Sequence, residues 1–391
     1  MNNWEEVILG DWIKTNIESV TEKYSHEKIL YLDTGSITSG KIDNLQELLL
    51  SEAPSRAKRI VRENDIIYSS VRPNQRHFGY ITNPQANLVV STGFIVISCD
   101  TTKILPKYLY YYLISDRSVE YLHTIAEGST SAYPSLKPSD IESLKILLPP
   151  LPEQRAIAGV LSSLDDKIDL LHRQNQTLEA LAQTLFRQWF IEEAEEDWEE
   201  RPLSFFGEIV CGKTPSKKEP ELFGGDIPFI KIPDMHGNVF IFSTTDTLSE
   251  SGKNSQFNKT LPAKSICVSC IATVGLVSMN IVESQTNQQI NSIIPNKPEY
   301  RYFLFLLMRR STDLLTSMAS GGTATLNLNT GNFSQINVLF PGEEFLVNFH
   351  QLIKPLFNKI FHNQSQIKTL EKLRNTLLPK LMSGEVRVQQ K

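Results

Sequence analysis

The chain has 391 residues, of which 40% are hydrophobic and 21% are charged, values typical of a globular protein with two or three domains. This composition excludes a disordered chain, and no run of about 18 apolar residues predicts a membrane-spanning helix. The formal net charge of −5 argues against strong binding to nucleic acid by charge alone, because affinity for phosphates comes mainly from Lys and Arg.

The N-terminal residues and the cysteines indicate where the protein works. The first residues, MNNWEEVILGDW, lack the basic stretch and apolar run of a signal peptide. The cysteines Cys99, Cys211, Cys267 and Cys270 are too few and too unevenly spaced for a disulfide framework. We therefore expect a cytoplasmic protein that does not associate with a membrane.

The two halves of the chain repeat one pattern. TLEALAQTL begins at Thr177 and TLEKLRNTL at Thr369, an offset of 192 residues, about half the chain length. The similarity extends to three further pairs of segments and fades toward the start of each half: 128–149 with 321–341, 106–118 with 300–311, and 64–70 with 264–270. We predict an α+β protein in which two similar α/β domains are related by a pseudo-two-fold axis.

In chain order, the first candidate binding loop is SSVRPNQRHFG at residues 69–79, between two strand-like runs. Side chains of its residue types form hydrogen bonds to bases and phosphates. The candidates for contact with DNA are Arg72, Asn74, Gln75, Arg76 and His77. A solvated hairpin tip is the alternative interpretation, because such loops favour the same residues.

The second candidate is GSTSAY at residues 128–133, just before a strand-like run. Its Gly and small hydroxyl residues allow a close approach to phosphate, and its Tyr is available to pack on a sugar or base. The candidates are Ser129, Thr130, Ser131 and Tyr133. A plain turn before the strand is the alternative.

A long helix is predicted over residues 151–192, and a second one with a C-terminal tail over 342–391. The first begins with Pro residues, followed by an acid, and apolar residues then recur every three or four positions, as in a coiled coil. The same stripe returns in the second half of the chain, at the offset of the repeat. We expect the interface to contain Ile157, Leu161, Leu164, Ile168, Leu171, Leu178 and Leu185 in the first helix and Ile353, Leu356, Ile360, Ile367, Leu370 and Leu377 in the second.

The charge around the two helices predicts that they pair with each other. The net charge is −8 over residues 151–200 and +4 over residues 341–391, so the two helices attract each other. Pairing also buries the two apolar stripes, which would each cost about 25 cal/mol per Å² if left in water. A pseudo-two-fold axis makes the pairing antiparallel, and about 35 helical residues span roughly 50 Å. Two positions of the apolar stripes, or seam, are polar, Asn175 and Asn363. They either fix the register of the pairing or lie near a helix bend or are exposed. Pairing within one chain and pairing between two chains both remain open.

Between the first helix and the second half, IEEAEEDWEE at residues 191–200 predicts a solvated linker. The loop CGKTPSKKEPELFGG at residues 211–225 then offers Lys213, Lys217 and Lys218 for phosphate contact. The alternative is a charged surface loop that only maintains solubility.

Two further segments of the second half carry candidates. SQTNQQIN at residues 284–291 offers Gln285, Gln288 and Gln289 as base readers, although Gln288 or Gln289 can equally face a neighbouring strand. Gly322 and Thr323 occupy the repeat positions of Ser129 and Thr130.

Motifs for catalysis are absent. The sequence contains no GxxxxGK[ST], GxGxxG or HExxH motif. NPQA at residues 83–86 lacks the aromatic residue of an adenine-methylase NPP[FY] site and predicts a turn. CVSC at residues 267–270 has the spacing of a metal or redox pair, but without a second pair we interpret it as two small buried strand residues. We predict no catalytic residue, no bound metal and no cofactor in this chain.

LKILLPPLPEQRAIAGVL at residues 144–161 and TLLPKLMSGEVRV at residues 376–388 resemble conserved regions of the specificity (S) subunits of type I restriction-modification systems. The resemblance covers essentially the whole chain. It implies target recognition domains at residues 1–150 and 193–341, each reading half of a split DNA sequence, and a coiled coil from residues 151–192 and 342–391 between them. FPGEEFLVNF at residues 340–349 departs from the pattern of the first repeat.

The resemblance also implies partners. In this family the S subunit is not catalytic. It recruits two modification (methyltransferase) subunits, which use S-adenosylmethionine to methylate adenine, and restriction subunits, which use ATP and Mg to translocate and cleave double-stranded DNA. The alternatives are a single-chain DNA adenine methyltransferase or nuclease with unrecognised motifs, and a scaffold that binds only proteins.

Overall fold

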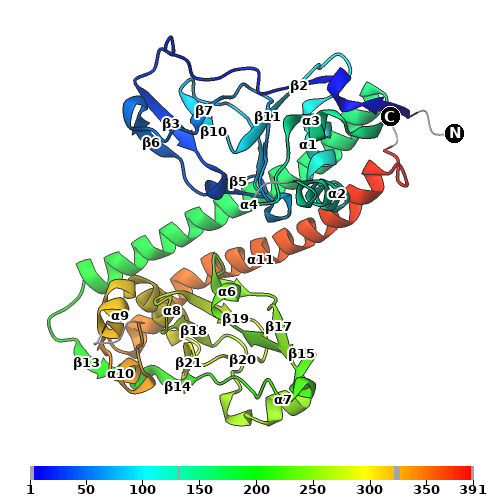
Figure 1. Cartoon of the computed structure of the whole chain (residues 1–391). Coiled ribbons are helices and arrows are strands. Elements are labelled where there is room, and N and C mark those ends of the chain that lie inside the picture. The colour runs from blue at the N-terminus through cyan, green and yellow to red at the C-terminus, as the bar shows by residue number, and fades with distance from the viewer. Residues whose placement is uncertain (1–3, 130–132, 321–325, 389–391) are drawn as a thin grey trace. The chain divides into compact units, whose positions relative to one another are not determined.

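The computed structural model describes residues 4–129, 133–320 and 326–388 (Figure 1). The chain forms two compact units, residues 1–167 with 370–391 and residues 168–369. Among the described residues, no helix combines the length and the apolar character needed to span a bilayer.

The first unit contains two four-stranded sheets. The first sheet is antiparallel and has the order β2 (Ile13–Thr15), β11 (Phe94–Cys99), β8 (Ile66–Ser69) and β9 (Phe78–Tyr80). The second has the order β6 (Gln46–Leu49), β3 (Lys28–Leu32), β10 (Leu88–Ser91) and β7 (Ala57–Ile60), and β3 and β10 are parallel. Two short antiparallel pairs complete the strands: β1 (Glu5–Ile8) with β12 (Lys145–Leu148), and β4 (Ile37–Thr38) with β5 (Lys41–Ile42).

The helices of this unit are short. They are α1 (Pro106–Ile114), α2 (Asp116–Glu127), α3 (Pro138–Glu142) and the 3-10 turns η1 (Leu9–Asp11), η2 (Thr34–Ser36), η3 (Leu50–Glu52) and η4 (Pro73–Gln75).

Strand β8 is apolar on both faces because both faces are covered. Ile66 and Tyr68 belong to a core cluster with α1 and α2, whereas Ile67, on the opposite face, packs in the cluster shared with the second sheet. All four residues of β8 are buried. Burial on both sides explains why this strand reads as a continuous apolar run.

The second unit is built on the same plan. Its main sheet has the order β14 (Gly207–Cys211), β21 (Ile290–Pro295), β18 (Ile266–Ser269), β19 (Val277–Asn280) and β16 (Phe240–Ile241). The smaller sheet has the order β17 (Asp246–Leu248), β15 (Phe223–Ile230) and β20 (Gln285–Thr286), and β15 and β20 are parallel. A further antiparallel pair joins β13 (Glu199–Pro202) to β22 (Asn337–Phe340).

The helices of the second unit pack against both of its sheets. They are α5 (Leu203–Phe206), α6 (Ile232–Met235), α7 (Glu250–Asn254), α8 (Tyr300–Arg310), α9 (Thr312–Ala319), α10 (Thr330–Ser334) and the 3-10 turns η6 (Pro220–Leu222) and η7 (Phe257–Lys259).

The prediction of two similar α/β domains is confirmed. In each unit the parallel pair, β3 with β10 or β15 with β20, has an antiparallel neighbour on its other side, β6 or β17. Strands β12 and β22 begin at Lys145 and Asn337, and this pair keeps the offset of the sequence repeat. Strands β8 and β18 begin at Ile66 and Ile266, which is close to that offset. Strands β3 and β15 lie where the sequence similarity has faded, so the common topology extends beyond the recognisable repeat.

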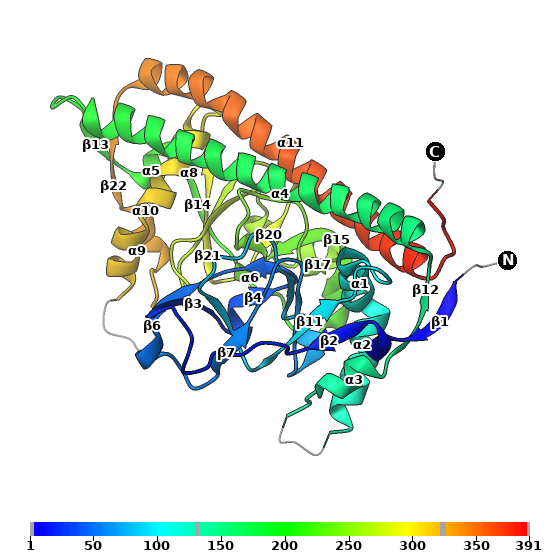
Figure 2. The same cartoon turned by 90° about the horizontal axis from the view of Figure 1, so that it is seen from above.

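Two long helices complete both cores. Helix α4 (Leu151–Arg187) continues into the π-helical turn η5 (Gln188–Glu192), and α11 runs from Glu343 to Met382. Figures 1 and 2 show α4 and α11 side by side within each unit. In the second unit, Asn175 contacts Asn363 and Phe186 contacts Phe349, so the two helices are antiparallel and pair within one chain.

The residues of the predicted seam are shielded from solvent. None of its members is exposed. Buried members are Ile157, Leu161, Ile168, Leu171, Ile353, Ile360 and Ile367, and half-buried members are Leu164, Leu178, Leu185, Leu356, Leu370 and Leu377.

The two seam asparagines form a buried amide pair in the second unit. Nδ2 of Asn363 donates to Oδ1 of Asn175 at 2.9 Å, and the residues are 1% and 5% exposed. The alternative of exposed asparagines is therefore wrong. A shift of register would break this hydrogen bond between two buried amides in an apolar seam, which favours a role in fixing the register.

A polar junction joins the first unit's sheet and helix layer to the two long helices. The Tyr111 hydroxyl on α1 donates to Asp165 Oδ2 at 2.7 Å, and Arg374 Nη1 donates to Asp165 Oδ1 at 2.8 Å. Burial raises the pKa of Tyr111, as does the neighbouring Asp165 carboxylate, so the hydroxyl remains a donor at neutral pH. Asp165 is therefore the common acceptor for α1 and α11.

We expect Asp165→Ala to lower the free energy of unfolding by about 1–3 kcal/mol, because it leaves the fully buried Tyr111 hydroxyl without an acceptor. Guanidinium unfolding followed by circular dichroism measures the change. Asp166→Ala is the matched control, since Asp166 is exposed and should change the midpoint little. Equal midpoints for the two variants would contradict this role.

The acidic segment is only partly a linker. Residues 191–197 are exposed, but Glu199 and Glu200 belong to β13, and the Trp198 ring packs against Phe190 at a centroid distance of 6.2 Å.

Candidate DNA-recognition surface

The two candidate loops of the first unit form one surface. The Arg72 amide donates to the Pro134 carbonyl at 3.0 Å, and the Leu136 amide donates to the Ser70 carbonyl at 2.7 Å. Val71 and Ser135 form an isolated antiparallel bridge between these contacts. The structure thus brings together two segments that are far apart in the sequence.

Arg72 has the most accessible cationic side chain of this surface. Its backbone is left-handed, with φ of 48°, and its guanidinium lies 5.0 Å from the centroid of the Tyr133 ring. Tyr133 is 60% exposed. An exposed guanidinium beside an exposed ring offers both hydrogen-bond donors and a stacking face to a nucleic acid.

The remaining candidates of the first unit differ in accessibility. Asn74 and Gln75 are exposed on η4. Arg76 is half-buried and ion-paired with Asp116, and His77 is half-buried with Nδ1 2.5 Å from the Ile37 carbonyl. Arg76 and His77 therefore already have partners within the protein.

The small hydroxyl residues are only partly described. Ser129 is half-buried, and its Oγ accepts from the Ser135 amide at 3.3 Å. Thr130 and Ser131 lie outside the described residues, as do Gly322 and Thr323 of the second unit.

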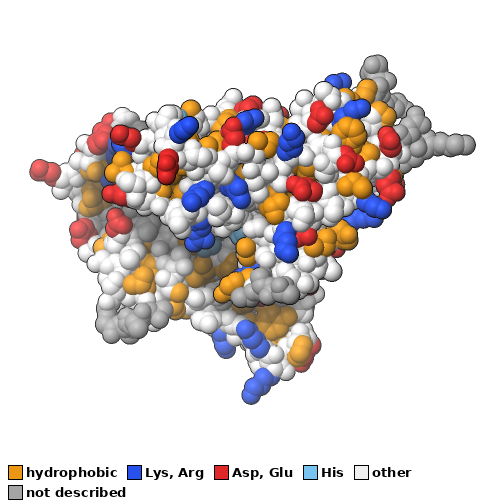
Figure 3. All heavy atoms as spheres, turned by 45° about the horizontal axis from the view of Figure 1, so that its top comes forward, with side chains coloured by type: hydrophobic (Ala, Val, Ile, Leu, Met, Phe, Trp, Pro, Cys, Tyr) orange, Lys and Arg blue, Asp and Glu red, His pale blue; other side chains and the backbone are white. Residues whose placement is uncertain are grey.

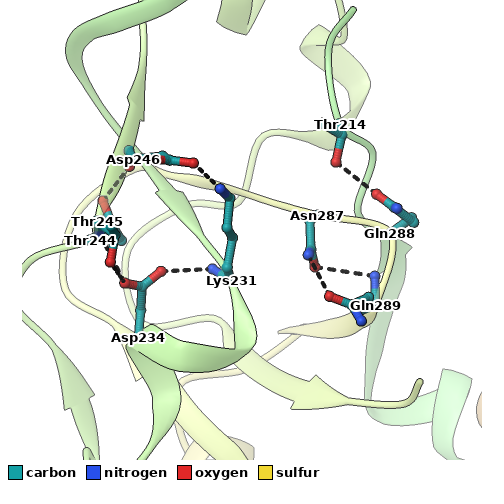
Figure 4. A network of polar contacts seen from close by, with 9 residues as sticks. All are labelled: Thr214, Lys231, Asp234, Thr244, Thr245, Asp246, Asn287, Gln288 and Gln289. Atoms are coloured by element: carbon teal, nitrogen blue, oxygen red, sulfur yellow. Dashed lines mark hydrogen bonds and ion pairs between the residues drawn. The ribbon is translucent and has the colours of Figure 1, made fainter. Parts of the chain in front are cut away.

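Two candidate loops of the second unit also meet (Figure 4). The Lys213 amide donates to the Thr286 carbonyl at 2.9 Å, and the Thr214 hydroxyl donates to Gln288 Oε1 at 2.7 Å. Gln288 is exposed, whereas Gln289 is half-buried and its Oε1 accepts from Asn287 Nδ2 at 2.8 Å. Gln288 is therefore the more accessible amide.

The three lysines of the basic loop remain candidates for phosphate contact. Lys213, Lys217 and Lys218 are all exposed, and none forms an ion pair with a residue of the described segments. Their charges are thus available to a polyanion.

The prediction that Gln285 reads a base is wrong. The residue is 0% exposed on β20, and its Nε2 donates to the Lys253 carbonyl at 3.0 Å and to Thr260 Oγ1 at 2.9 Å. Its Oε1 accepts from Gln256 Nε2 at 2.7 Å. These contacts engage both ends of the amide and connect β20 to α7 and to the segment that follows it.

Sequence reasoning missed a network beside these loops. The Lys231 amide donates to Asp234 Oδ2 at 2.9 Å, its ammonium pairs with Asp246, and Asp234 Oδ1 accepts from both the amide and the hydroxyl of Thr245 at 2.9 Å (Figure 4). Lys231 follows the end of β15 directly, next to the end of β20. A charged residue after an apolar strand is a weak signal, and its partners are visible only in the fold.

The CVSC cysteines lie inside the second unit. Cys267 on β18 is 0% exposed and takes the place of Ile67 on β8, while Cys270 is 1% exposed. Burial raises the pKa of Cys267 to about 12 and that of Cys270 to about 11, so both thiols are protonated at neutral pH. Within the described segments, no three His, Cys, Asp or Glu side chains cluster as metal ligands.

Charge on the visible face is mixed. In Figure 3, Lys and Arg side chains are interspersed with Asp and Glu side chains over most of this face. The exposed lysines of the loop with Lys213 are one local source of positive charge.

Comparisons with known proteins agree with this arrangement. A family model described as "Type I restriction modification DNA specificity domain" matches residues 1–180 and 195–372. The chain is 36% identical to the type I restriction enzyme HindI specificity subunit of Haemophilus influenzae, over 99% of this chain and 100% of that protein. It is 30% identical to the type I restriction enzyme MjaIX specificity subunit of Methanocaldococcus jannaschii, over 85% of this chain and 80% of that protein. A solved type I restriction-modification S subunit from M. genitalium has the same fold, with a TM-score of 0.60 at 17% identity, covering 100% of this chain and 97% of that one.

Proposed function

Since this chain belongs to the family of type I restriction-modification specificity subunits, we propose that it reads a split double-stranded DNA target, one half with each α/β domain. One observation carries the proposal: two domains of the same topology each gather polar loops on one surface, and both are built onto the same two helices. A pair of matched readers suits a target in two parts.

The two helices set the distance between the half-sites. Both α4 and α11 pass from one compact unit to the other, so each belongs to the core of both. A helical pair with a continuous apolar seam resists bending, and its length then determines how many unread base pairs separate the halves.

Catalysis belongs to other polypeptides. The chain recruits two methyltransferase subunits, which carry S-adenosylmethionine, and restriction subunits, which carry ATP and Mg. The absence of catalytic motifs supports this division of labour. The strand-to-helix junction also occurs twice, as β12 to α4 and β22 to α11, so each half of the chain offers a subunit a junction of the same topology, with a different sequence at residues 340–349. The free cysteines fit a cytoplasmic complex.

Selection from random DNA tests the proposal. The full-length chain, alone and with modification subunits, is incubated with a randomised duplex library at stated salt, and bound or adenine-methylated molecules are sequenced. We expect a motif of two short half-sites with a fixed gap, weak binding by the chain alone and methylation only in the complex. Methylation by the chain alone would identify an enzyme, and binding of subunits without DNA would identify a protein-only scaffold.

Replacing Lys213, Lys217 and Lys218 together by Ala should weaken DNA binding by the complex about equally for all sequences. Each lysine that contacts a phosphate contributes about one to the slope of log affinity against log salt concentration, so the slope should flatten by up to about three. Fluorescence anisotropy at several salt concentrations measures it. Lys264→Ala, which removes one lysine elsewhere in the same unit, is the control. A change in the preferred bases with an unchanged slope would contradict phosphate contact.

A further inference from the structure

The second unit contains a loop, residues 271–276, in the place that the Arg72 loop occupies in the first. The two loops follow the equivalent strands β18 and β8. The Ala272 amide donates to the Leu326 carbonyl at 3.0 Å, and the Leu328 amide donates to the Cys270 carbonyl at 2.9 Å. These contacts repeat the two backbone hydrogen bonds of the first unit's surface, and the bridge between Ile271 and Asn327 repeats the one between Val71 and Ser135.

Both loops hold a non-glycine residue in the left-handed conformation at the same position. Ala272 has φ of 64° and Arg72 has φ of 48°. Glycine adopts this backbone without steric cost, so a side chain at both positions is retained against a conformational penalty. The shared backbone conformation therefore places the side chains of Arg72 and Ala272 at corresponding points of the two loops.

The loop is exposed and held in a defined conformation. Ala272 and Thr273 are exposed, and the Cys270 amide donates to the Gln289 carbonyl at 2.8 Å, so the loop borders the segment with Gln288. Gly275, the next-to-last residue of the loop, has φ of 91°, and a Cβ there would lie 2.5 Å from Thr312 Cγ2. A fixed loop requires little ordering when a ligand binds.

We propose that residues 271–276 form a base-reading loop of the second domain that recognises a thymine methyl group, while the Arg72 loop reads guanine in the other half-site. This inference rests on the proposed function. The exposed residues at the tip of the second loop are Ala272 and Thr273, whose side chains carry methyl groups and one hydroxyl. Small apolar groups contact the C5-methyl of thymine in the major groove. Arg72 instead presents the bidentate donor that matches guanine O6 and N7.

The test uses the complex with modification subunits and selection from a randomised duplex library. Thr273→Ser removes the methyl and keeps the hydroxyl, whereas Thr273→Val keeps a methyl and removes the hydroxyl. We expect Thr273→Ser to lower the thymine preference at one second-half-site position roughly tenfold, and Thr273→Val to retain it. Ala272→Arg copies the first repeat and should shift that preference toward guanine.

Unchanged recognition of the first half-site in the same experiment shows that each variant chain is folded. Gln335→Ala, at an exposed position of the same unit, is the control substitution. If the complex selects a bipartite target and neither Thr273→Ser nor Ala272→Arg changes its base preferences, the proposed function stands and this inference is wrong. A loss of preference in Thr273→Val but not in Thr273→Ser assigns recognition to the hydroxyl and also overturns it. A wild-type complex that selects no bipartite target overturns the proposed function and this inference with it.

Discussion

Lengthening α4 and α11 by seven residues each should lengthen the unread gap of the DNA target and leave both half-sites unchanged. Insertions after Lys167 and after Thr369 fall where the chain passes from one unit to the other. Seven residues keep the heptad pattern and add about 10 Å of helix, against about 3.4 Å per base pair. We therefore expect a gap longer by at least one and at most about three base pairs, and at least a hundredfold loss of affinity for the original target.

Methylation mapping on a randomised library, with the variant chain in the complex, measures the gap. An insertion in α4 alone is the informative control, because it shifts one helix against the other and should abolish specific binding rather than change the spacing. An unchanged gap in the double insertion would show that the helices do not set the distance.

Replacing Phe349 by Ala should destabilise the second unit by about 3–5 kcal/mol. Phe349 is 0% exposed on α11, and its ring lies 4.7 Å from the Phe190 ring and 6.2 Å from the Phe186 ring, centroid to centroid. Removing it leaves a cavity where α4, η5 and α11 meet. The free energy of unfolding comes from guanidinium denaturation, with hydrogen exchange of β18 and β21 assigning the loss to this unit.

Leu352→Ala on the same helix is the matched control for Phe349. Leu352 is 43% exposed, so its replacement should change the free energy of unfolding by only about 0.5 kcal/mol, as is usual for surface positions. If the two variants lost equal stability, helix propensity rather than the aromatic cluster would explain the effect.

The architecture and the family were predictable because their signals are periodic or locally repeated. The heptad stripe marked the seam of α4 and α11, and the segments 144–161 and 376–388 carried the family resemblance that the family model and full-length relatives confirm. The sequence of the buried strand β18 could be matched to that of β8 in the other half of the chain. Alternate residues of each strand pack in corresponding core clusters of the two units. These features depend on residues close together in the chain.

The accessibility of polar residues was not predictable, because distant segments determine it. The segment SQTNQQIN has the composition of a loop, yet Gln285 is buried because β20 pairs with β15 and the Gln256 side chain is hydrogen-bonded to its amide. Gln288, which follows shortly after in the same segment, is exposed. The loop at 271–276 was not predictable as a site because it contains no charged residue. Only its backbone contacts to residues 326–328 show that it is equivalent to the Arg72 loop.

The order in which the two cores can be completed follows from where the last residues of α11 lie. Leu381 and Met382 are buried with Ile157 and Leu161 in the first unit, although the whole second unit separates them in the chain. The ribosome makes residues 168–369 before it makes these last core residues, so the N-terminal half emerges first yet completes its core last. A stop codon shortly before Leu377 would leave the second unit's sequence intact and an apolar gap in the first.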